Sequence, residues 1–170
     1  VGVCHVLRYS PYFRALKRVL DEGRVGDVLS IQHLEPIRFH HFAHSYVRGN
    51  WQSAKQTTPL ILAKACHDLD IVRWLLNKPC KQVTAFGDLS FFKRQNEPAG
   101  AADRCEDCAV ESQCPFSAQR IYVKQHRHLY VFDNLPKDRA ANDLKIKEYL
   151  RTTSYGRCVF ANIAGLHQAG

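Results

Sequence analysis

The hydrophobic pattern predicts a helix near the start of the chain. Apolar side chains recur there every three or four residues, the spacing that places them on one face of a helix. The apolar positions of this face are Phe13, Leu16, Val19 and Leu20. Ser10 and Pro11 are typical of a helix start and Gly23 is typical of a stop, so we expect a helix from Pro11 to just before Gly23. Further helices are predicted near residues 117 to 125 and 138 to 151.

Strands are predicted where apolar and polar residues alternate. Residues 27 to 37 alternate in this way, and residues 81 to 92 form a second run. The first six residues, VGVCHV, have the β-branched composition of a strand already under way. Residues 38 to 52 are aromatic and basic, so we expect an irregular loop there. Strands and helices together predict a fold of the mixed α and β class.

A second long helix is predicted over residues 60 to 76, LILAKACHDLDIVRWLL. Thr58 and Pro59 mark its start. At about 100° per residue, one broad face is apolar while Lys64 and His67 lie on the opposite side. The predicted core face consists of Leu62, Ala65, Leu69, Val72 and Leu76, and the opposite face carries Ala63, Lys64, His67, Ile71 and Trp74.

Lys64 and His67 form a candidate catalytic pair. A neighbouring ammonium lowers the pKa of a histidine by like-charge repulsion, which favours a general base near pH 7. The segment before this helix offers more polar side chains that could line a site, namely His41, His44, Tyr46, Arg48 and Trp51. The alternative is a structural histidine bonded to the backbone, with Asp68 and Asp70 as surface or capping charges.

Cysteines form the second candidate site. Cys105, Cys108 and Cys114 follow the pattern C-x2-C-x5-C. Thiolates bind Zn²⁺ tetrahedrally and a C-x2-C pair supplies two ligands from one turn, so a fourth partner is needed. Cys158 or a histidine is the candidate for that position. The alternative is a set of reduced thiols packed in a loop, because the second cysteine pair of a zinc ribbon is absent.

Composition narrows the class of protein. A chain of 170 residues, 45% of them hydrophobic, can form one domain with its own core. The net charge of +8 is dispersed, so we expect a solvated basic surface and no nucleic-acid partner. No apolar run reaches the roughly 18 residues of a membrane span, and no signal-like segment opens the chain. Seven cysteines without such a signal favour a reducing, cytoplasmic location.

Two stretches resemble a known family. Residues 5 to 32 resemble the segment that leaves the Rossmann domain in the glucose-fructose oxidoreductase and inositol dehydrogenase family (Gfo/Idh/MocA). The matching positions are Arg8, Tyr9, Pro11, Gly23 and Gly26. Residues 63 to 76 resemble the family's histidine-bearing helix, with matches at His67, Asp70, Arg73, Trp74 and Leu75. The resemblance covers residues 1 to 92 well and continues through the cysteine segment as a subfamily insertion.

The resemblance implies an NAD(P)-dependent oxidoreductase that acts on a sugar, polyol or related hydroxy compound. His67 would accept the proton of the substrate hydroxyl as hydride leaves its carbon, with Lys64 beside it. The expected substrate-binding residues are Arg8, Tyr9, His44, Tyr46, Arg48, Trp51 and Asp70. The implied fold is α+β, an open, mostly antiparallel sheet with helices on one face. We expect that sheet to be truncated and to pair with another copy in a homo-oligomer.

The resemblance also implies a domain order. Residues 1 to 10 would end a Rossmann domain, and residues 11 to 170 would form the C-terminal substrate-binding and oligomerisation domain, with a cysteine-bearing insertion at about 93 to 116. NAD or NADP would bind mainly to the preceding domain, because no G-x-G-x-x-G motif occurs in this sequence. The absence of methionine also predicts a piece of a longer protein. Without the preceding domain that the resemblance implies, we expect this piece to be inactive alone.

One departure from the family and two alternatives stay open. Ala63 stands where many members have an aspartate, and Lys64 replaces it only in part, because an ammonium cannot accept a proton. Some relatives cleave glycosides through a transient oxidation, so an NAD-assisted glycoside hydrolase domain is one alternative. The other is a zinc-stapled, non-catalytic binding or assembly module in which His67 has no chemical role.

Overall fold

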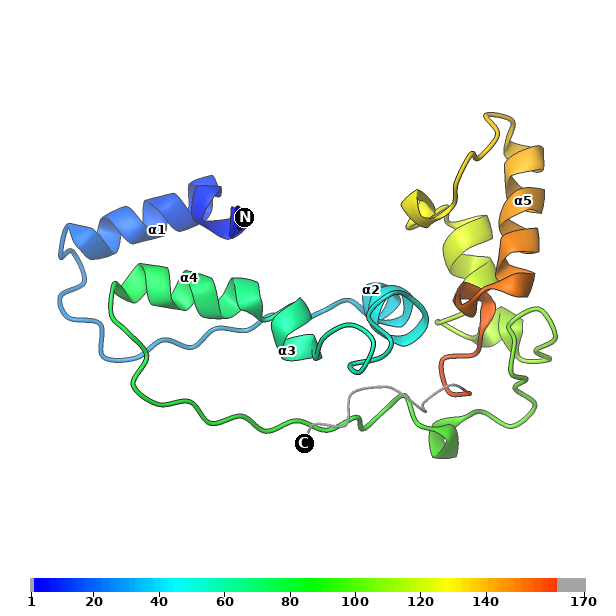
Figure 1. The fold of residues 1–170 in the computed structure, drawn as a ribbon, viewed down its shortest axis with the longest axis horizontal. Helices are drawn as coiled ribbons and strands as arrows, with labels where there is room; N and C mark the ends of the chain where they lie inside the picture. The colour runs from blue at the N-terminus through cyan, green and yellow to red at the C-terminus, as the bar shows by residue number, and fades with distance from the viewer. Residues whose placement is uncertain (1, 162–170) are drawn as a thin grey trace. The chain divides into compact units, whose positions relative to one another are not determined.

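The computed structural model describes residues 2 to 161, and the chain divides into two compact units (Figure 1). Unit 1 consists of residues 1–36 and 60–86. Unit 2 consists of residues 37–59 and 87–170, of which the last nine lie outside the described residues. Within residues 2 to 161, none of the helices is both long enough and apolar enough to cross a membrane.

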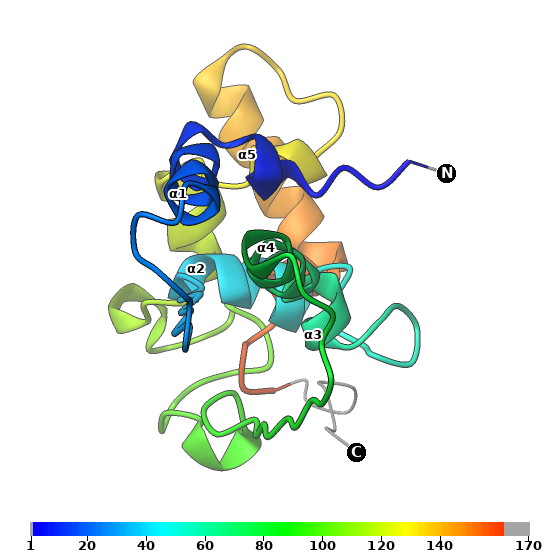
Figure 2. The same ribbon diagram turned by 90° about the vertical axis from the view of Figure 1, so that its left-hand side faces the viewer.

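Unit 1 is built around two helices that lie side by side (Figures 1 and 2). In chain order its helices are η1 (Val6–Tyr9), α1 (Pro11–Asp21), α3 (Leu60–Ala63) and α4 (Cys66–Leu76). The predicted start of α1 at Pro11 is confirmed. The ammonium of Lys17 in α1 lies 5.9 Å from the ring centroid of Trp74 in α4, a cation–π contact between the two helices.

The helix predicted over residues 60 to 76 is present but interrupted. A turn at Lys64 and Ala65 separates α3 from α4. The predicted core face is wrong, because Leu69 is 55% exposed whereas Ile71, expected on the opposite face, is fully buried. Apolar residues occur on both sides of this helix, so periodicity alone does not decide which side packs.

Unit 2 is also helical. Its helices are α2 (Phe39–Phe42), η2 (Ala43–Arg48), η3 (Arg94–Asn96), η4 (Glu111–Gln113), η5 (Gln119–Lys124), η6 (Leu129–Val131), α5 (Arg139–Thr152) and η7 (Ser154–Gly156). The helices predicted near 117 to 125 and 138 to 151 are confirmed as η5 and α5. Asp138 caps α5 by accepting a hydrogen bond from the backbone N–H of Ala141 at 2.9 Å. The loop predicted at 38 to 52 is wrong, because α2 and η2 occupy most of it.

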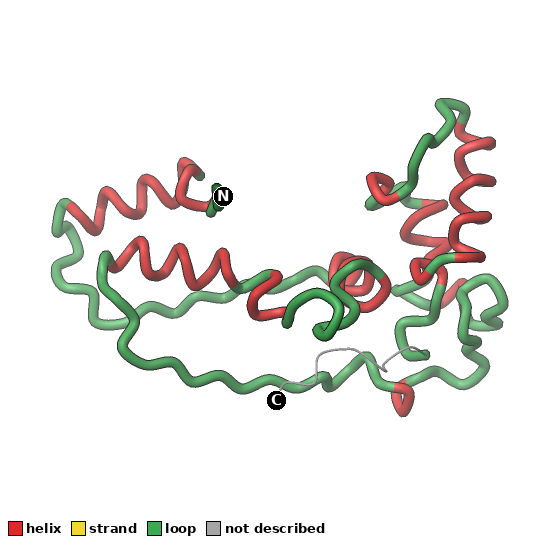
Figure 3. The backbone as a smooth tube through the Cα atoms, viewed as in Figure 1, coloured by secondary structure: helices red, strands yellow, loops and turns green. Residues whose placement is uncertain are grey.

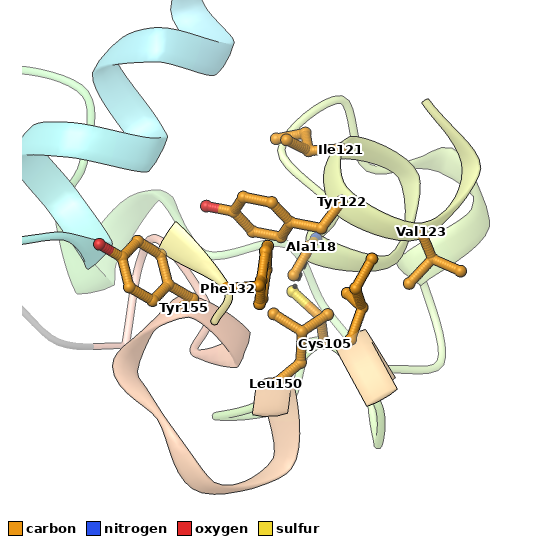
Figure 4. Close-up of a cluster of buried hydrophobic side chains, with 9 residues drawn as sticks. Cys105, Ala118, Ile121, Tyr122, Val123, Phe132, Leu150 and Tyr155 are labelled. Atoms are coloured by element: carbon orange, nitrogen blue, oxygen red, sulfur yellow. Dashed lines mark hydrogen bonds between the residues drawn. The ribbon is translucent and has the colours of Figure 1, made fainter. Parts of the chain in front are cut away.

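Two clusters of buried side chains form the core of unit 2. The first gathers residues of η5, η6, α5 and η7 around Tyr122, with Cys105 among them (Figure 4). The second is rich in phenylalanine, and the rings of Phe42 and Phe92 stack there with centroids 5.5 Å apart. Aromatic packing therefore holds together segments that are far apart in the sequence.

The predicted antiparallel sheet is wrong. Between residues 2 and 161 the structure contains no strand, only one isolated antiparallel bridge between Arg104 and Arg157 (Figure 3). Residues 27 to 37 and 81 to 92 form no strand, and Leu29 and Phe86 within them are 95% and 96% exposed. Alternation gives an extended segment an apolar side, but a strand also needs a neighbour to pair its backbone groups.

The missing sheet in the described residues affects two further predictions, the strand at the start of the chain and the homo-oligomer. Residues 2 to 5, expected in a strand, form no regular element and lead into η1. The homo-oligomer stays a prediction, but the described residues do not form the sheet through which it was expected.

Gly156 lies where the chain packs against the segment that contains Cys105. The backbone N–H of Cys105 donates to the carbonyl of Gly156 at 2.9 Å, next to the Arg104–Arg157 bridge. A Cβ added at Gly156 would collide with the backbone carbonyl of Leu150. Only glycine fits here without movement of the backbone.

We expect Gly156→Ala to destabilise the protein by about 1–3 kcal/mol or more, the usual cost of overpacking. Chemical denaturation followed by circular dichroism measures the change. Gly87→Ala is the matched control, because nothing lies within 4 Å of the added methyl group. Equal stability of the two variants would contradict the close approach at Gly156.

Candidate active site

Arg8 and Asp70 join η1 to α4 in unit 1. The Arg8 guanidinium donates from Nε to Oδ2 of Asp70 at 2.8 Å and from Nη2 to Oδ1 at 2.5 Å. His5 Nε2 lies 3.6 Å from the same Oδ1. The hydrogen bond from Arg8 holds the pKa of Asp70 below its usual range, and the same bond raises the pKa of Arg8. Asp70 is therefore an ionised partner of Arg8, with both carboxylate oxygens engaged.

His67 lies in the first turn of α4, one turn before Asp70. The residue is half-buried, and its Nδ1 atom is buried without a hydrogen-bond partner among the described residues. A positive charge on His67 would help to lower the pKa of Asp70, which places the ring near that carboxylate. The backbone N–H of His67 donates to the carbonyl of Lys64 at 3.3 Å. The chain thus holds an imidazole whose hydrogen bonds are not all used within the fold.

Lys64 contacts a group that the sequence analysis did not identify. Its ammonium lies 2.8 Å from Oε1 of Glu35, and His33 Nε2 lies 2.6 Å from Oδ1 of Asp68. These contacts join the extended segment before Pro36 to α4 and to the turn that precedes it. Two spacings in the sequence could have indicated them: alternate residues His33 and Glu35 share one side of an extended segment, and Lys64 and Asp68 are four residues apart.

Three of the four expected substrate-binding residues in unit 2 are core residues. His44, Tyr46 and Arg48 are 2%, 4% and 1% exposed. Trp51 is 39% exposed. The substrate role of these four stays a prediction, and burial favours a structural role for the first three. Tyr9, in η1 of unit 1, is 72% exposed.

His44 is held by aromatic neighbours. Its Nδ1 lies 2.8 Å from the hydroxyl of Tyr122, and its Nε2 lies 3.1 Å from that of Tyr130. Its ring stacks on His128 with centroids 4.2 Å apart. Burial, followed by the charges of neighbouring histidines and Arg48, lowers the pKa of His44 to about 3. The ring is therefore neutral at pH 7.

The four expected zinc ligands line one cavity in unit 2, although they are not spaced for a single ion. Cys105, Cys108, Cys114 and Cys158 all contribute to its wall. Among the histidine, cysteine, aspartate and glutamate side chains of the described residues, only His33, Glu35 and Asp68 form a set of three whose ligand atoms all lie within 4.8 Å of one another. No three of the four sulfurs are that close, so the structure does not support a preformed zinc site. Burial raises the pKa of the Cys114 and Cys158 thiols.

Comparison with known proteins identifies the family. Residues 13–110 match the family described as the GFO/IDH/MocA C-terminal domain. The chain belongs to this family. The matched residues include Lys64, His67 and Asp70, whereas Arg8 and Cys158 lie outside them. The resemblance to Gfo/Idh/MocA proteins is thereby confirmed, while the roles of single residues stay predictions.

Two curated relatives are similar to this GFO/IDH/MocA chain. One is "Putative oxidoreductase YteT" of Bacillus subtilis, 29% identical over 120 residues, which cover 68% of this chain and 28% of the relative. The other is "Inositol 2-dehydrogenase 2" of Saccharopolyspora erythraea, 33% identical over 85 residues, which cover 50% of this chain and 22% of the relative. The matches thus span about a quarter of each relative. No solved structure matches the chain.

Proposed function

We propose that this chain is the substrate-binding domain of an NAD(P)-dependent oxidoreductase in which His67 is the general base. The observation that carries the proposal is the position of His67. It lies within the residues that match the GFO/IDH/MocA family, half-buried, with a buried ring nitrogen that no described residue bonds. Oxidation of an alcohol requires a base for the hydroxyl proton, and histidine is the commonest side chain in that role.

The nucleotide would be held elsewhere in the protein. The sequence contains no glycine-rich phosphate loop, so these residues do not themselves form a site for the pyrophosphate. We assign that site to a preceding Rossmann domain, of which residues 1 to 10 would be the end and residues 11 to 170 the following domain. When bound, the nicotinamide supplies the hydride acceptor. The protein that contains both domains is called the complete enzyme here.

Asp70 would help to position His67, and Lys64 would help to bind the substrate. Both oxygens of Asp70 are engaged by Arg8, so Asp70 would orient η1 against α4 rather than bind substrate directly. Lys64 would donate a hydrogen bond to a substrate oxygen after exchanging its contact with Glu35. Neither side chain competes with His67 as the proton acceptor.

A sugar or polyol is the proposed substrate. The support is similarity to a relative that is named an inositol 2-dehydrogenase, together with the oxidoreductase name of the other relative. The exposed ring of Tyr9, in the same unit as His67, offers an apolar surface of the kind that packs against the carbon face of a sugar.

Isotope transfer tests the proposed function. The complete enzyme is incubated with NAD⁺ or NADP⁺ and polyols that carry deuterium on the carbon of the reacting hydroxyl. We expect deuterium in the reduced nicotinamide and a ketone product. Polyols deuterated only on oxygen are the control and should transfer none. If the substrate is a glycoside, its cleavage without net reduced nicotinamide would favour the glycoside hydrolase alternative. An absence of deuterium transfer across a broad panel of polyols would contradict the proposal.

A further inference from the structure

Four cysteines surround one cavity in unit 2, and the proposed oxidoreductase chemistry uses none of them. Three come from the segment between Cys105 and Cys114, and the fourth is Cys158. The Arg104–Arg157 bridge brings these segments together, and the backbone N–H of Cys158 donates to the carbonyl of Asp103 at 2.8 Å. Because side chains alternate along paired segments, Cys105 and Cys158 fall on the same face of the bridge.

A buried arginine lines the same cavity. Arg48 is 1% exposed and donates from Nε to the carbonyl of Arg157 at 2.7 Å and from Nη2 to Sγ of Cys105 at 3.3 Å. Its Nη1 atom is buried without a partner, and no ion pair joins Arg48 to a carboxylate within residues 2 to 161. Glu111, also in the cavity wall, accepts a hydrogen bond from Ser117.

Among the described residues, no carboxylate forms an ion pair with the guanidinium, and Glu111 in the same wall is bonded to Ser117 instead. A buried charge is costly unless an opposite charge lies beside it. Neutral thiols do not supply that charge, whereas thiolates bound to a metal do. Four thiolates around Zn²⁺ or around a cubane cluster of charge 2+ leave a net charge of about −2, which would be stabilised by Arg48. The four protons of the thiols pass to the solvent as the metal binds.

We propose that Cys105, Cys108, Cys114 and Cys158 bind a metal centre of the thiolate class, with Arg48 as its buried charge partner. Zinc and an iron–sulfur cluster share this ligand chemistry, and analysis of the bound metal distinguishes them. Zinc holds its ligands at about 2.3 Å, which brings four sulfurs to about 3.8 Å from one another. No three of the four sulfurs lie within 4.8 Å of one another in the structure, so binding of a single zinc ion would draw them closer together.

The centre would stabilise the cysteine segment. Between Cys105 and Cys114 that segment contains one short helix, η4, and Cys105 itself packs against Ala118 and Leu150 in the core (Figure 4). A metal bound by all four cysteines would fix this segment against the chain at Cys158. The proposal does not rest on the proposed function, because neither His67 nor a nucleotide takes part in it.

Metal and sulfide analysis of the unmutated protein tests the proposal without relying on a variant. The protein is produced with both iron and zinc supplied, purified without oxygen, and analysed for iron, zinc and acid-labile sulfide per chain. We expect bound metal in stoichiometric amount, either one zinc without sulfide, or about four irons and four sulfides with broad visible absorption that bleaches on reduction. Zinc without sulfide would identify the metal as zinc, iron with sulfide would identify a cluster, and binding of neither metal would overturn the four-thiolate site.

Cysteine variants locate the centre. Cys158→Ser and Cys108→Ser should lose most of the bound metal, whereas Cys80→Ser, at an exposed cysteine of unit 1, should retain all of it. Circular dichroism checks that the variants remain folded. Four free thiols in a metal-free folded protein, a disulfide among the four, or equal metal in all three variants would overturn the proposal.

Discussion

Replacing His67 by alanine should lower kcat of the complete enzyme by about 100-fold or more, while the affinity for NAD(P) stays unchanged. The reason is the loss of the group that takes the hydroxyl proton as hydride leaves the substrate. His67 lies within the family match, and its buried Nδ1 atom has no hydrogen-bond partner among residues 2 to 161. Steady-state kinetics and cofactor titration by fluorescence measure the two quantities separately.

Chemical rescue separates a catalytic role from a structural one. Added imidazole should restore part of the activity of His67→Ala, because a small base can occupy the space that the side chain leaves. His126→Ala is the control, since His126 bonds Asp143 in unit 2 and lies outside the family match. A loss below about tenfold, or the same loss in His126→Ala, would contradict the role of His67 as general base.

Local chemistry in the sequence predicted α1, η5 and α5, although it missed α2 and η2. Pro11 starts α1 and Asp138 caps α5, and both effects act within one turn of the chain. The sheet could not be predicted in the same way. Alternation at residues 27 to 37 identifies an extended segment, but pairing depends on residues far away, and Leu29 there packs against nothing that covers it.

The motifs identified candidate residues but not their partners. Arg8 and Asp70 were both expected near a substrate, and the structure instead joins them across 62 positions of sequence. Arg48 and His44 lie in a segment whose aromatic and basic composition predicted an irregular loop. Their burial depends on bonds to residues 109 and 78 positions away, and spacing within the segment contains no trace of those bonds.

For the cysteines, too, the sequence predicted the candidate residues, whereas their surroundings come from the fold. Their spacing predicted a metal-binding set, and the structure places all four around one cavity. The gathering of the four sulfurs around one cavity and the buried charge of Arg48 come only from the fold, and together they support a thiolate metal centre. The sequence indicates the ligand chemistry here, whereas the fold shows which residue could balance the charge of the bound group.

Acid should destabilise unit 2 through His44. Burial lowers the pKa of this ring to about 3 in the folded protein, whereas an unfolded histidine titrates near pH 6.5. Between these values the unfolded state binds the extra proton, so stability is complete above about pH 6.5 and falls as pH decreases. One proton gives at most about 1.4 kcal/mol per pH unit, and solvent screening reduces that figure.

Urea denaturation at pH 7 and pH 5 measures this effect in the wild type and in His44→Gln, which keeps hydrogen-bonding groups near Tyr122 and Tyr130 but does not titrate. The wild type should lose up to about 2 kcal/mol more than the variant on acidification. A residual loss is expected in the variant, because burial also lowers the pKa of His40 and His128. Tyr130→Phe is the control, since it removes a partner of His44 without removing the titrating ring, and it should keep the wild-type pH dependence. Equal losses in the wild type and His44→Gln would show that the buried imidazole does not couple folding to protonation.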